Sequence, residues 1–227
     1  MKHNHLALGL ILASVVFILG IVLFVPNPIA NAMDGTNTSH KYYFDEDTGT
    51  YKVKAGGGSD RILVSKYYPT NLEINVGDTV MWYNPTKVPE PHTVTFVKNP
   101  AANPPLLGPY AISNSSQLIP LPPGSNSEPL LVPSQDGKGS VVLAVNARVY
   151  YPVIIDSEGK ETTLAPNATY SMDGTEQYVN SGYLLPQGQS KEMPGSSEQF
   201  TVKFEKSGSY SYSCMFHPWM AGTITVK

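Results

Sequence analysis

Short stretches in which hydrophobic and polar residues alternate recur along this chain after about residue 60. In Leu72–Val76 and Thr79–Tyr83 most apolar side chains occupy every second position, and Gly77-Asp78 separates the two stretches. A period of two is typical of a strand with one buried face, and a two-residue Gly-containing connection is typical of a tight turn. This part of the sequence therefore predicts a β-hairpin.

The same reasoning predicts further short strands along the chain. They are Arg61–Tyr67, His92–Val97, Phe200–Phe204, Tyr210–Ser213 and Gly222–Val226. The chain holds 19 Gly, 20 Pro and 14 Tyr among its 227 residues. This composition favours short strands and loops over long helices. Many short strands separated by turn residues predict an all-β fold of the sandwich type.

The N-terminus carries a different pattern. Residues 6–25 form an uncharged apolar run, preceded by Lys2 and followed by Ala30-Asn31-Ala32. The basic start and the small-residue site are typical of a secretory signal peptide, whose apolar region usually spans about 7–15 residues. A membrane span needs about 20 apolar residues, which this run supplies. Residues 1–32 are thus interpreted as a signal peptide or a membrane anchor. Both alternatives place the rest of the chain outside the cytoplasm.

The remainder divides by composition. Residues 33–59 are polar and end in a Gly-rich stretch, which is typical of a linker. Residues 60–227 are predicted to form one domain with an insertion at about 98–178. The first half of the insertion is rich in Pro, Asn, Ser and Gly, whereas two apolar segments of its second half predict strands, Val141–Val145 and Arg148–Ile155. Three roles are open for the insertion: it covers a site, forms a docking surface, or adds a sheet edge.

Charge and cysteine content narrow the possible functions. With 15 Lys and Arg against 18 Asp and Glu, the formal net charge is −3, and the sequence has no basic stripe of the kind that binds nucleic acid. We therefore expect no nucleic-acid partner. The single cysteine, Cys214, cannot form an internal disulfide. In an exported chain, an unpaired cysteine indicates an intermolecular bridge, a reactive thiol or a metal ligand.

The neighbours of Cys214 favour the metal ligand. His217 and Met220 follow it at intervals of three residues. A thiolate, an imidazole and a thioether on one loop are the ligands that select copper for electron transfer. His92, in an upstream strand, would complete a His₂Cys set with an axial Met. The candidate copper ligands are therefore His92, Cys214, His217 and Met220, and we expect one copper per chain.

The sequence also resembles the cupredoxins, the small blue copper proteins of the plastocyanin and azurin family. Three segments carry this resemblance: residues 76–82, 91–94 and 208–214. The spacing Cys-x-x-His-x-x-Met at Cys214–Met220 is most similar to amicyanin and halocyanin. The likeness covers about 61–97 and 179–227, and it implies a Greek-key cupredoxin β-sandwich.

The resemblance implies roles around the copper. The backbone N–H of Thr93 is expected to donate to the sulfur of Cys214. Many cupredoxins carry Asn where this chain has Thr93, which leaves open whether a side chain ties the two ligand loops together. The edge of His217 is expected to be the electron port, with Phe216, Pro218 and Trp219 supplying an apolar patch around it.

Together these observations predict an exported type 1 (blue) copper protein that carries single electrons. Four protein ligands leave no obvious open position on the metal, which favours a carrier over an enzyme. The alternative is a copper-dependent redox enzyme or sensor acting on a small molecule such as a nitrogen oxide, because the insertion is large enough to create an open position. The expected partners are redox proteins of a respiratory chain, docking transiently near His217. Residues 6–25 provide a possible membrane anchor.

Overall fold

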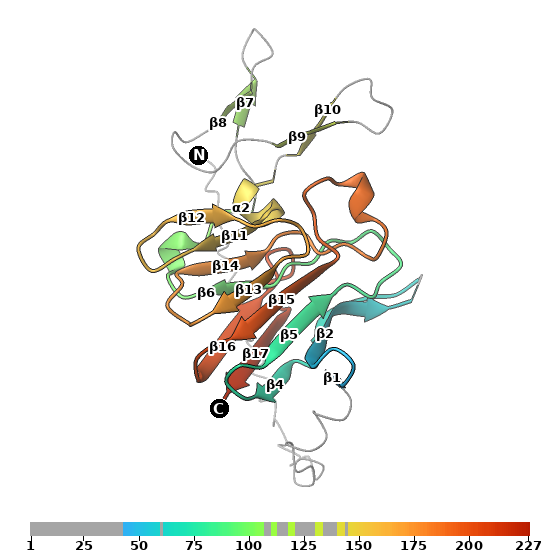
Figure 1. The fold of residues 1–227 in the computed structure, drawn as a ribbon. Helices are drawn as coiled ribbons and strands as arrows, with labels where there is room; N and C mark the ends of the chain where they lie inside the picture. Colours follow the sequence, from blue (N-terminus) through green and yellow to red (C-terminus); the bar gives the residue numbers. More distant parts are fainter. Residues whose placement is uncertain are drawn as a thin grey trace, which may run out of the picture. The chain divides into compact units, whose positions relative to one another are not determined.

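The fold is described from a computed structural model, which covers residues 43–59, 61–106, 110–112, 118–120, 130–133, 140–143 and 145–227. Most of the strands in the described residues belong to two sheets (Figure 1). The predicted signal peptide or anchor, residues 1–32, lies outside the described residues. Within the described part of the chain, no helix is long and apolar enough to cross a membrane.

The first sheet has six strands in the order β1-β2-β5-β15-β13, with β3 also paired to β2. Its strands are β1 (Phe44–Asp45), β2 (Thr50–Gly58), β3 (Leu63–Tyr68), β5 (Thr79–Tyr83), β13 (Thr169–Met172) and β15 (Gln199–Phe204). In β5 the burial alternates as the sequence predicts, with Val80 and Trp82 facing inward. One face of this sheet therefore lies on the core, and the other faces outward.

The second sheet has seven strands in the order β12-β11-β14-β6-β16-β17-β4. Its strands are β4 (Asn71–Ile74), β6 (Thr95–Val97), β11 (Pro152–Ile155), β12 (Glu161–Thr163), β14 (Tyr178–Ser181), β16 (Gly208–Ser213) and β17 (Ala221–Val226). Neighbours far apart in sequence, such as β6 and β16, are paired at Thr95 and Ser213. This pairing brings the end of the His92 segment beside the start of the Cys214 loop.

Side chains from both sheets share one hydrophobic core. It includes Val53, Trp82 and Phe200 of the first sheet and Phe96 and Tyr212 of the second. The rings of Trp82 and Tyr212 meet edge to face, with centroids 5.2 Å apart. This geometry stabilises an aromatic pair in addition to the gain from burying its apolar surface. The prediction of an all-β sandwich is confirmed.

The described parts of the predicted insertion contribute edges to both sheets. Strand β13 pairs parallel with β15, and β11 and β12 extend the seven-stranded sheet beyond β14. Of the three roles left open by the sequence, the addition of sheet edges is therefore observed. The region also contains two separate hairpins and a 3₁₀ turn: β7 (Tyr110–Ile112) with β8 (Leu118–Pro120), β9 (Leu130–Pro133) with β10 (Ser140–Leu143), and η1 (Pro100–Ala102).

Three segments differ from the sequence-based expectation. The hairpin predicted from Leu72–Val76 and Thr79–Tyr83 does not form. The chain turns between them, but β4 pairs with β17 in the second sheet and β5 pairs with β2 and β15 in the first, because the turn passes from one layer of the sandwich to the other. Thr50–Gly58, assigned to a polar linker, forms the long strand β2 inside the first sheet, and its alternating Tyr51, Val53 and Ala55 are buried. The start of the predicted strand Arg148–Ile155 is instead a helical turn, α2 (Ala147–Tyr150), because the side chain of Asn146 accepts a hydrogen bond from the Arg148 N–H and caps it. A second 3₁₀ turn, η2 (Ser190–Glu192), precedes β15.

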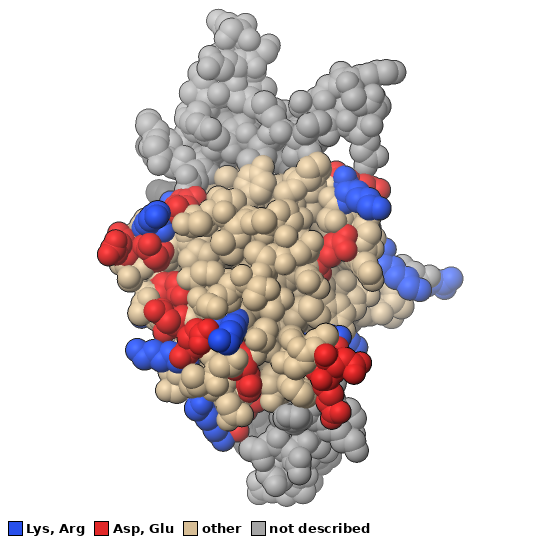
Figure 2. Space-filling view, in the orientation of Figure 1, with Lys and Arg blue, Asp and Glu red and all other residues tan. Residues whose placement is uncertain are grey.

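Charged side chains on the face drawn in Figure 2 lie mostly around its margin. Cations stand beside anions in several places on this face. Among the described residues, Lys203 pairs with Glu205 at 2.9 Å and Arg148 pairs with Glu161 at 2.7 Å. The middle of this face is uncharged. Exposed pairs of this kind contribute little to stability, typically 0–1 kcal/mol each by the general rule, so the buried core carries most of the fold's stability.

Candidate metal centre

Three of the predicted ligands meet at one end of the sandwich. The ligand atoms of His92, Cys214 and His217 all lie within 4.8 Å of one another, and Nδ1 of His217 is 3.6 Å from the Cys214 sulfur. His92 and Cys214 are buried, and His217 is half-buried. The grouping of two imidazoles and a thiol is therefore confirmed, although 122 residues separate His92 from Cys214.

Backbone contacts fix the position of His92. Its N–H donates to the carbonyl of Leu184 at 3.2 Å, and the Leu184 N–H donates back to the carbonyl of His92 at 2.8 Å. On the other side, the ring lies against Gly56 of β2, where an added Cβ would stand 2.5 Å from Nε2. Gly56 also has a φ of +97°, which favours glycine. The close approach of β2 to this imidazole therefore requires glycine at position 56.

The Cys214–Met220 loop closes on itself between β16 and β17. The Cys214 N–H donates to the carbonyl of Met220 at 2.9 Å, and the Met220 N–H donates to the carbonyl of His217 at 2.7 Å. Pairing of Ser213 with Ala221 holds the two ends of the loop together. Met220 is buried in the same core as Cys214. The spacing seen in the sequence thus corresponds to one tight loop that presents its residues at the end of a rigid hairpin.

Thr93 joins the two parts of the site in two ways. Its backbone N–H donates to the Cys214 sulfur at 3.4 Å, as expected from the sequence. Its Oγ1 accepts a hydrogen bond from the Met215 N–H at 2.9 Å. A threonine therefore supplies the side-chain tie between the ligand loops that the absence of Asn had left open.

A chain of hydrogen bonds links Thr93 to the predicted insertion. Thr93 Oγ1 lies 3.0 Å from Thr95 Oγ1, which donates to Oδ1 of Asn180 at 2.9 Å. The Asn180 amide then donates to the carbonyl of Arg148 at 2.7 Å. All three bridging side chains, Thr93, Thr95 and Asn180, are buried. The roles of Thr95 and Asn180 could not be predicted from the sequence, because they depend on the pairing of β6 with β14.

The protonation of His92 and Cys214 is set by their burial and their neighbours. Burial, and secondarily the electrostatic effect of the neighbouring His217, lower the pKa of His92 to about 4, so this imidazole is neutral near pH 7. Neither ring nitrogen of His92 has a hydrogen-bond partner, although both are buried. Burial raises the pKa of the Cys214 thiol, while hydrogen bonds from Thr93, Phe216 and His217 act in the opposite direction. A neutral imidazole with a free lone pair beside a buried thiol fits a copper ion, which binds thiolate and imidazole.

One charged residue at the site was missed from the sequence. Oε1 of Glu90 lies 3.1 Å from Nε2 of His217, and Oε2 lies 3.9 Å from Nε2 of His92. Glu90 is only two positions before His92, and that proximity was the one available signal. Its meeting with His217 depends on the fold.

The predicted apolar patch around His217 is only partly exposed. Trp219 is 73% exposed, and its ring meets the His217 ring edge to face with centroids 5.3 Å apart. Pro218 is also exposed. Phe216 is instead half-buried, with its ring 4.9 Å from that of Tyr183. The outer surface beside His217 therefore consists of Pro218 and Trp219, whereas Phe216 packs inward.

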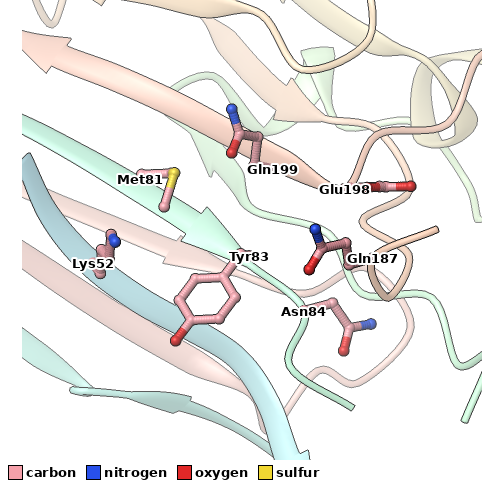
Figure 3. Close-up of a pocket in the computed structure, with 7 residues that line it drawn as sticks. All are labelled: Lys52, Met81, Tyr83, Asn84, Gln187, Glu198 and Gln199. Carbon is pink, nitrogen blue, oxygen red and sulfur yellow. The ribbon is translucent and has the colours of Figure 1, made fainter. Parts of the chain in front are cut away.

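A shallow groove of about 330 Å³ lies apart from these ligands (Figure 3). It is lined by Lys52, Met81, Tyr83, Asn84, Gln187, Glu198 and Gln199. None of these side chains is an imidazole or a thiol. The groove is connected to the ligand cluster through Asn84, whose amide donates to the carbonyl of Glu90 at 2.8 Å.

Comparison with known proteins agrees with this site. Residues 139–227 match the family described as copper binding proteins, plastocyanin/azurin family. The matched part contains Cys214, His217 and Met220, while His92 lies before it. The resemblance to the cupredoxins is therefore confirmed, and His92, Cys214 and His217 are grouped as the candidate copper site.

Solved structures of cupredoxins are also similar to the chain. A novel purple cupredoxin from Nitrosopumilus maritimus is 20% identical, with 78% of this chain and 98% of that chain covered and a TM-score of 0.29. Plastocyanin from Dryopteris crassirhizoma is 16% identical, with 78% and 99% covered and a TM-score of 0.30. Amicyanin from Paracoccus versutus is 16% identical, with 78% and 79% covered and a TM-score of 0.27. No curated protein sequence matches the chain.

Proposed function

We propose that this protein is an exported type 1 copper protein that carries single electrons between redox partners. The observation that carries the proposal is the cluster of His92, Cys214 and His217, whose ligand atoms lie within 4.8 Å of one another. Met220, buried in the same core, would be the weak fourth ligand. Copper held by these side chains would supply the change between Cu(I) and Cu(II).

The chain's own residues keep this site stiff. Backbone hydrogen bonds fix His92 to Leu184 and close the Cys214 loop at Met220. Thr93 ties the two segments together through Met215. Ligands held in this way move little when the charge of the metal changes, and small motion favours fast electron transfer. The rigidity of the donor set therefore supports a carrier.

The surroundings of His217 support a route for the electron. Its ring is half-buried and adjoins the exposed Trp219. A small apolar surface of this kind suits the brief docking of a redox partner, for which we propose proteins of a respiratory chain. The alternative, an enzyme or sensor for a small molecule such as a nitrogen oxide, requires an open position on the metal.

Export is proposed from the sequence. The apolar run at residues 6–25 and the Ala30-Asn31-Ala32 site support a cleaved signal peptide or a retained anchor. An extracytoplasmic location also accounts for the single unpaired cysteine as a metal ligand. Fractionation of the expressing cells, with sequencing of the mature N-terminus, distinguishes the two forms. Protein that starts at Met1 and stays in the cytoplasm would contradict export.

The copper assignment is tested by spectroscopy on the loaded protein. We expect an intense thiolate-to-copper band in the visible range and a type 1 spin-resonance signal, both lost in Cys214→Ala. A colourless Cu(II) protein, or colour that persists without the thiol, would contradict the site. Addition of azide separates the two functions: an unchanged spectrum supports a carrier, and a new ligand band together with steady turnover of nitric oxide or nitrite supports the enzyme.

A further inference from the structure

Among the described residues, one carboxylate lies close to Nε2 of both ligand imidazoles. Oε1 of Glu90 lies 3.1 Å from Nε2 of His217, and Oε2 lies 3.9 Å from Nε2 of His92. We propose that Glu90 is a positioning residue, which orients His217 toward the metal and lowers the reduction potential of the site. This inference rests on the proposed copper function and concerns how that site is tuned.

The first step is the orientation of His217. Its Nδ1 lies 3.6 Å from the Cys214 sulfur, so this nitrogen faces the ligand cluster. The opposite nitrogen, Nε2, is within hydrogen-bond distance of Glu90. A carboxylate that accepts a hydrogen bond from Nε2–H keeps the proton on Nε2. Because a neutral imidazole carries one ring N–H proton, Nδ1 then has a free lone pair. Glu90 therefore selects the tautomer of His217 that binds a metal through Nδ1.

The second step concerns His92. Its Nε2 is buried without a hydrogen-bond partner, and Gly56 forms one wall of its surroundings. The nearest carboxylate oxygen is Oε2 of Glu90 at 3.9 Å. At this distance the contact is electrostatic and not a hydrogen bond. Glu90 thus holds one ligand ring directly and places its negative charge beside the other.

Glu90 is itself held in place. Its N–H donates to the carbonyl of Val88 at 2.7 Å, and its carbonyl accepts from the amide of Asn84 at 2.8 Å. Asn84 is buried, and the same amide donates to Leu184, the residue paired with His92. The Glu90 side chain is 24% exposed. Its carboxylate is therefore placed by a fixed backbone and is partly shielded from water.

The negative charge of Glu90 is expected to change the reduction potential of the copper site. A negative group beside two copper-binding imidazoles favours the more positive oxidation state, and a hydrogen bond to the outer nitrogen makes the imidazole a stronger donor. Both effects stabilise Cu(II) relative to Cu(I). The carboxylate therefore lowers the reduction potential and biases the protein toward giving up its electron.

The experiment compares Glu90→Gln and Glu90→Ala with Glu205→Gln. Glu205 is a matched control, since it pairs with Lys203 and removal of its charge leaves the ligand cluster untouched. Voltammetry of the copper-loaded protein should show the equilibrium shifted toward Cu(I) by roughly three- to tenfold in both Glu90 variants. A tenfold shift corresponds to about 59 mV for one electron. A potential equal to that of Glu205→Gln would overturn the tuning role.

A second measurement does not depend on copper. In the metal-free protein, imidazole nitrogen NMR should find the His217 proton on Nε2 in the wild type and in Glu90→Gln, whose amide oxygen can still accept it. In Glu90→Ala the two tautomers should mix. The same tautomer in all three proteins would overturn the positioning role. If the wild type never turns blue with copper, the proposed function fails, while the NMR result still decides the role of Glu90.

Discussion

The backbone N–H of Thr93 donates a hydrogen bond to the Cys214 sulfur over 3.4 Å, although 121 residues separate the two positions. The Thr93 hydroxyl oxygen accepts the Met215 N–H at 2.9 Å. One residue therefore contacts the ligand loop twice, through its backbone and through its side chain. The two contacts have different consequences, because only the first reaches a metal ligand.

Thr93→Val separates these two contacts. The variant keeps the backbone N–H and a similar side-chain shape, but it leaves the half-buried Met215 N–H without this acceptor. We expect the free energy of unfolding of the metal-free protein to fall by about 1 kcal/mol, the lower end of the cost of an unsatisfied donor, because the group is only partly shielded from water. Urea unfolding measures this loss. The position of the visible copper band should change little, because the hydrogen bond to sulfur remains.

Thr225→Val is the control for that substitution. Thr225 is exposed on β17, where the same change should alter the free energy of unfolding by no more than about 0.5 kcal/mol. Equal stability of the two variants would mean that the Thr93 hydroxyl does not hold the loops together. A large shift of the band in Thr93→Val would contradict the separation of the two contacts.

Acid should destabilise the metal-free protein through His92. Its pKa is about 4 when folded, because of burial first and His217 second, and about 6.5 when unfolded. Between these values the unfolded chain binds a proton that the native state does not, so stability falls as the pH falls. At 1.36 kcal/mol per pKa unit, the loss between pH 6.5 and 4 is on the order of 3 kcal/mol. Below pH 4 this contribution is constant.

Urea titrations at several pH values test this expectation. His92→Gln is the matched variant, because it lacks the titrating group while the carboxylates of the chain still titrate. The difference between wild type and variant should therefore change across pH 4–6.5. Parallel stability curves for the two proteins over that range would show that His92 does not contribute.

The sequence was sufficient to predict the strands with a period of two and the closeness of Cys214 to His217. In β5 the inward residues Val80 and Trp82 alternate with outward ones. The chain also turns at Gly77 and Asp78, but the predicted hairpin was wrong, because β4 and β5 enter different sheets. Cys214 and His217 are close in sequence, so their meeting on one loop needed no knowledge of the fold. Local patterns of this kind are readable because strand period and turn chemistry act over a few residues.

Features that depend on contacts between distant segments were not readable. Gly56, Gly57 and Gly58 resemble a linker by composition, yet β2 needs glycine at position 56 because His92 occupies the space of a side chain. Glu90 likewise gives no signal of its contact with His217, which is 127 positions away. Such roles arise from tertiary packing, which overrides local preference.

Trp219→Ala tests whether Trp219 serves electron transfer at the surface or packing in the core. Since Trp219 is 73% exposed, we expect a change in the free energy of unfolding within about 0.5 kcal/mol. Electron self-exchange between reduced and oxidised protein, measured by NMR line broadening, should slow by about tenfold or more if this ring forms the docking surface beside His217. Val76→Ala, also exposed but located where β4 turns toward β5, should leave the rate unchanged. Equal rates in both variants would contradict a port at Trp219.

Met220→Leu tests the proposed axial ligand. The two side chains have similar volumes, so the buried position should lose less than about 1.5 kcal/mol of stability. Loss of the thioether removes a donor that favours Cu(II), and the reduction potential should rise. We expect a shift on the order of tenfold in the reduction equilibrium, about 59 mV for one electron, with the blue colour retained.

Met81→Leu makes the same change in the groove of Figure 3, away from the ligands, and should leave the potential unchanged. If both variants keep the wild-type potential, Met220 is a core residue and the copper is held by His92, Cys214 and His217 alone.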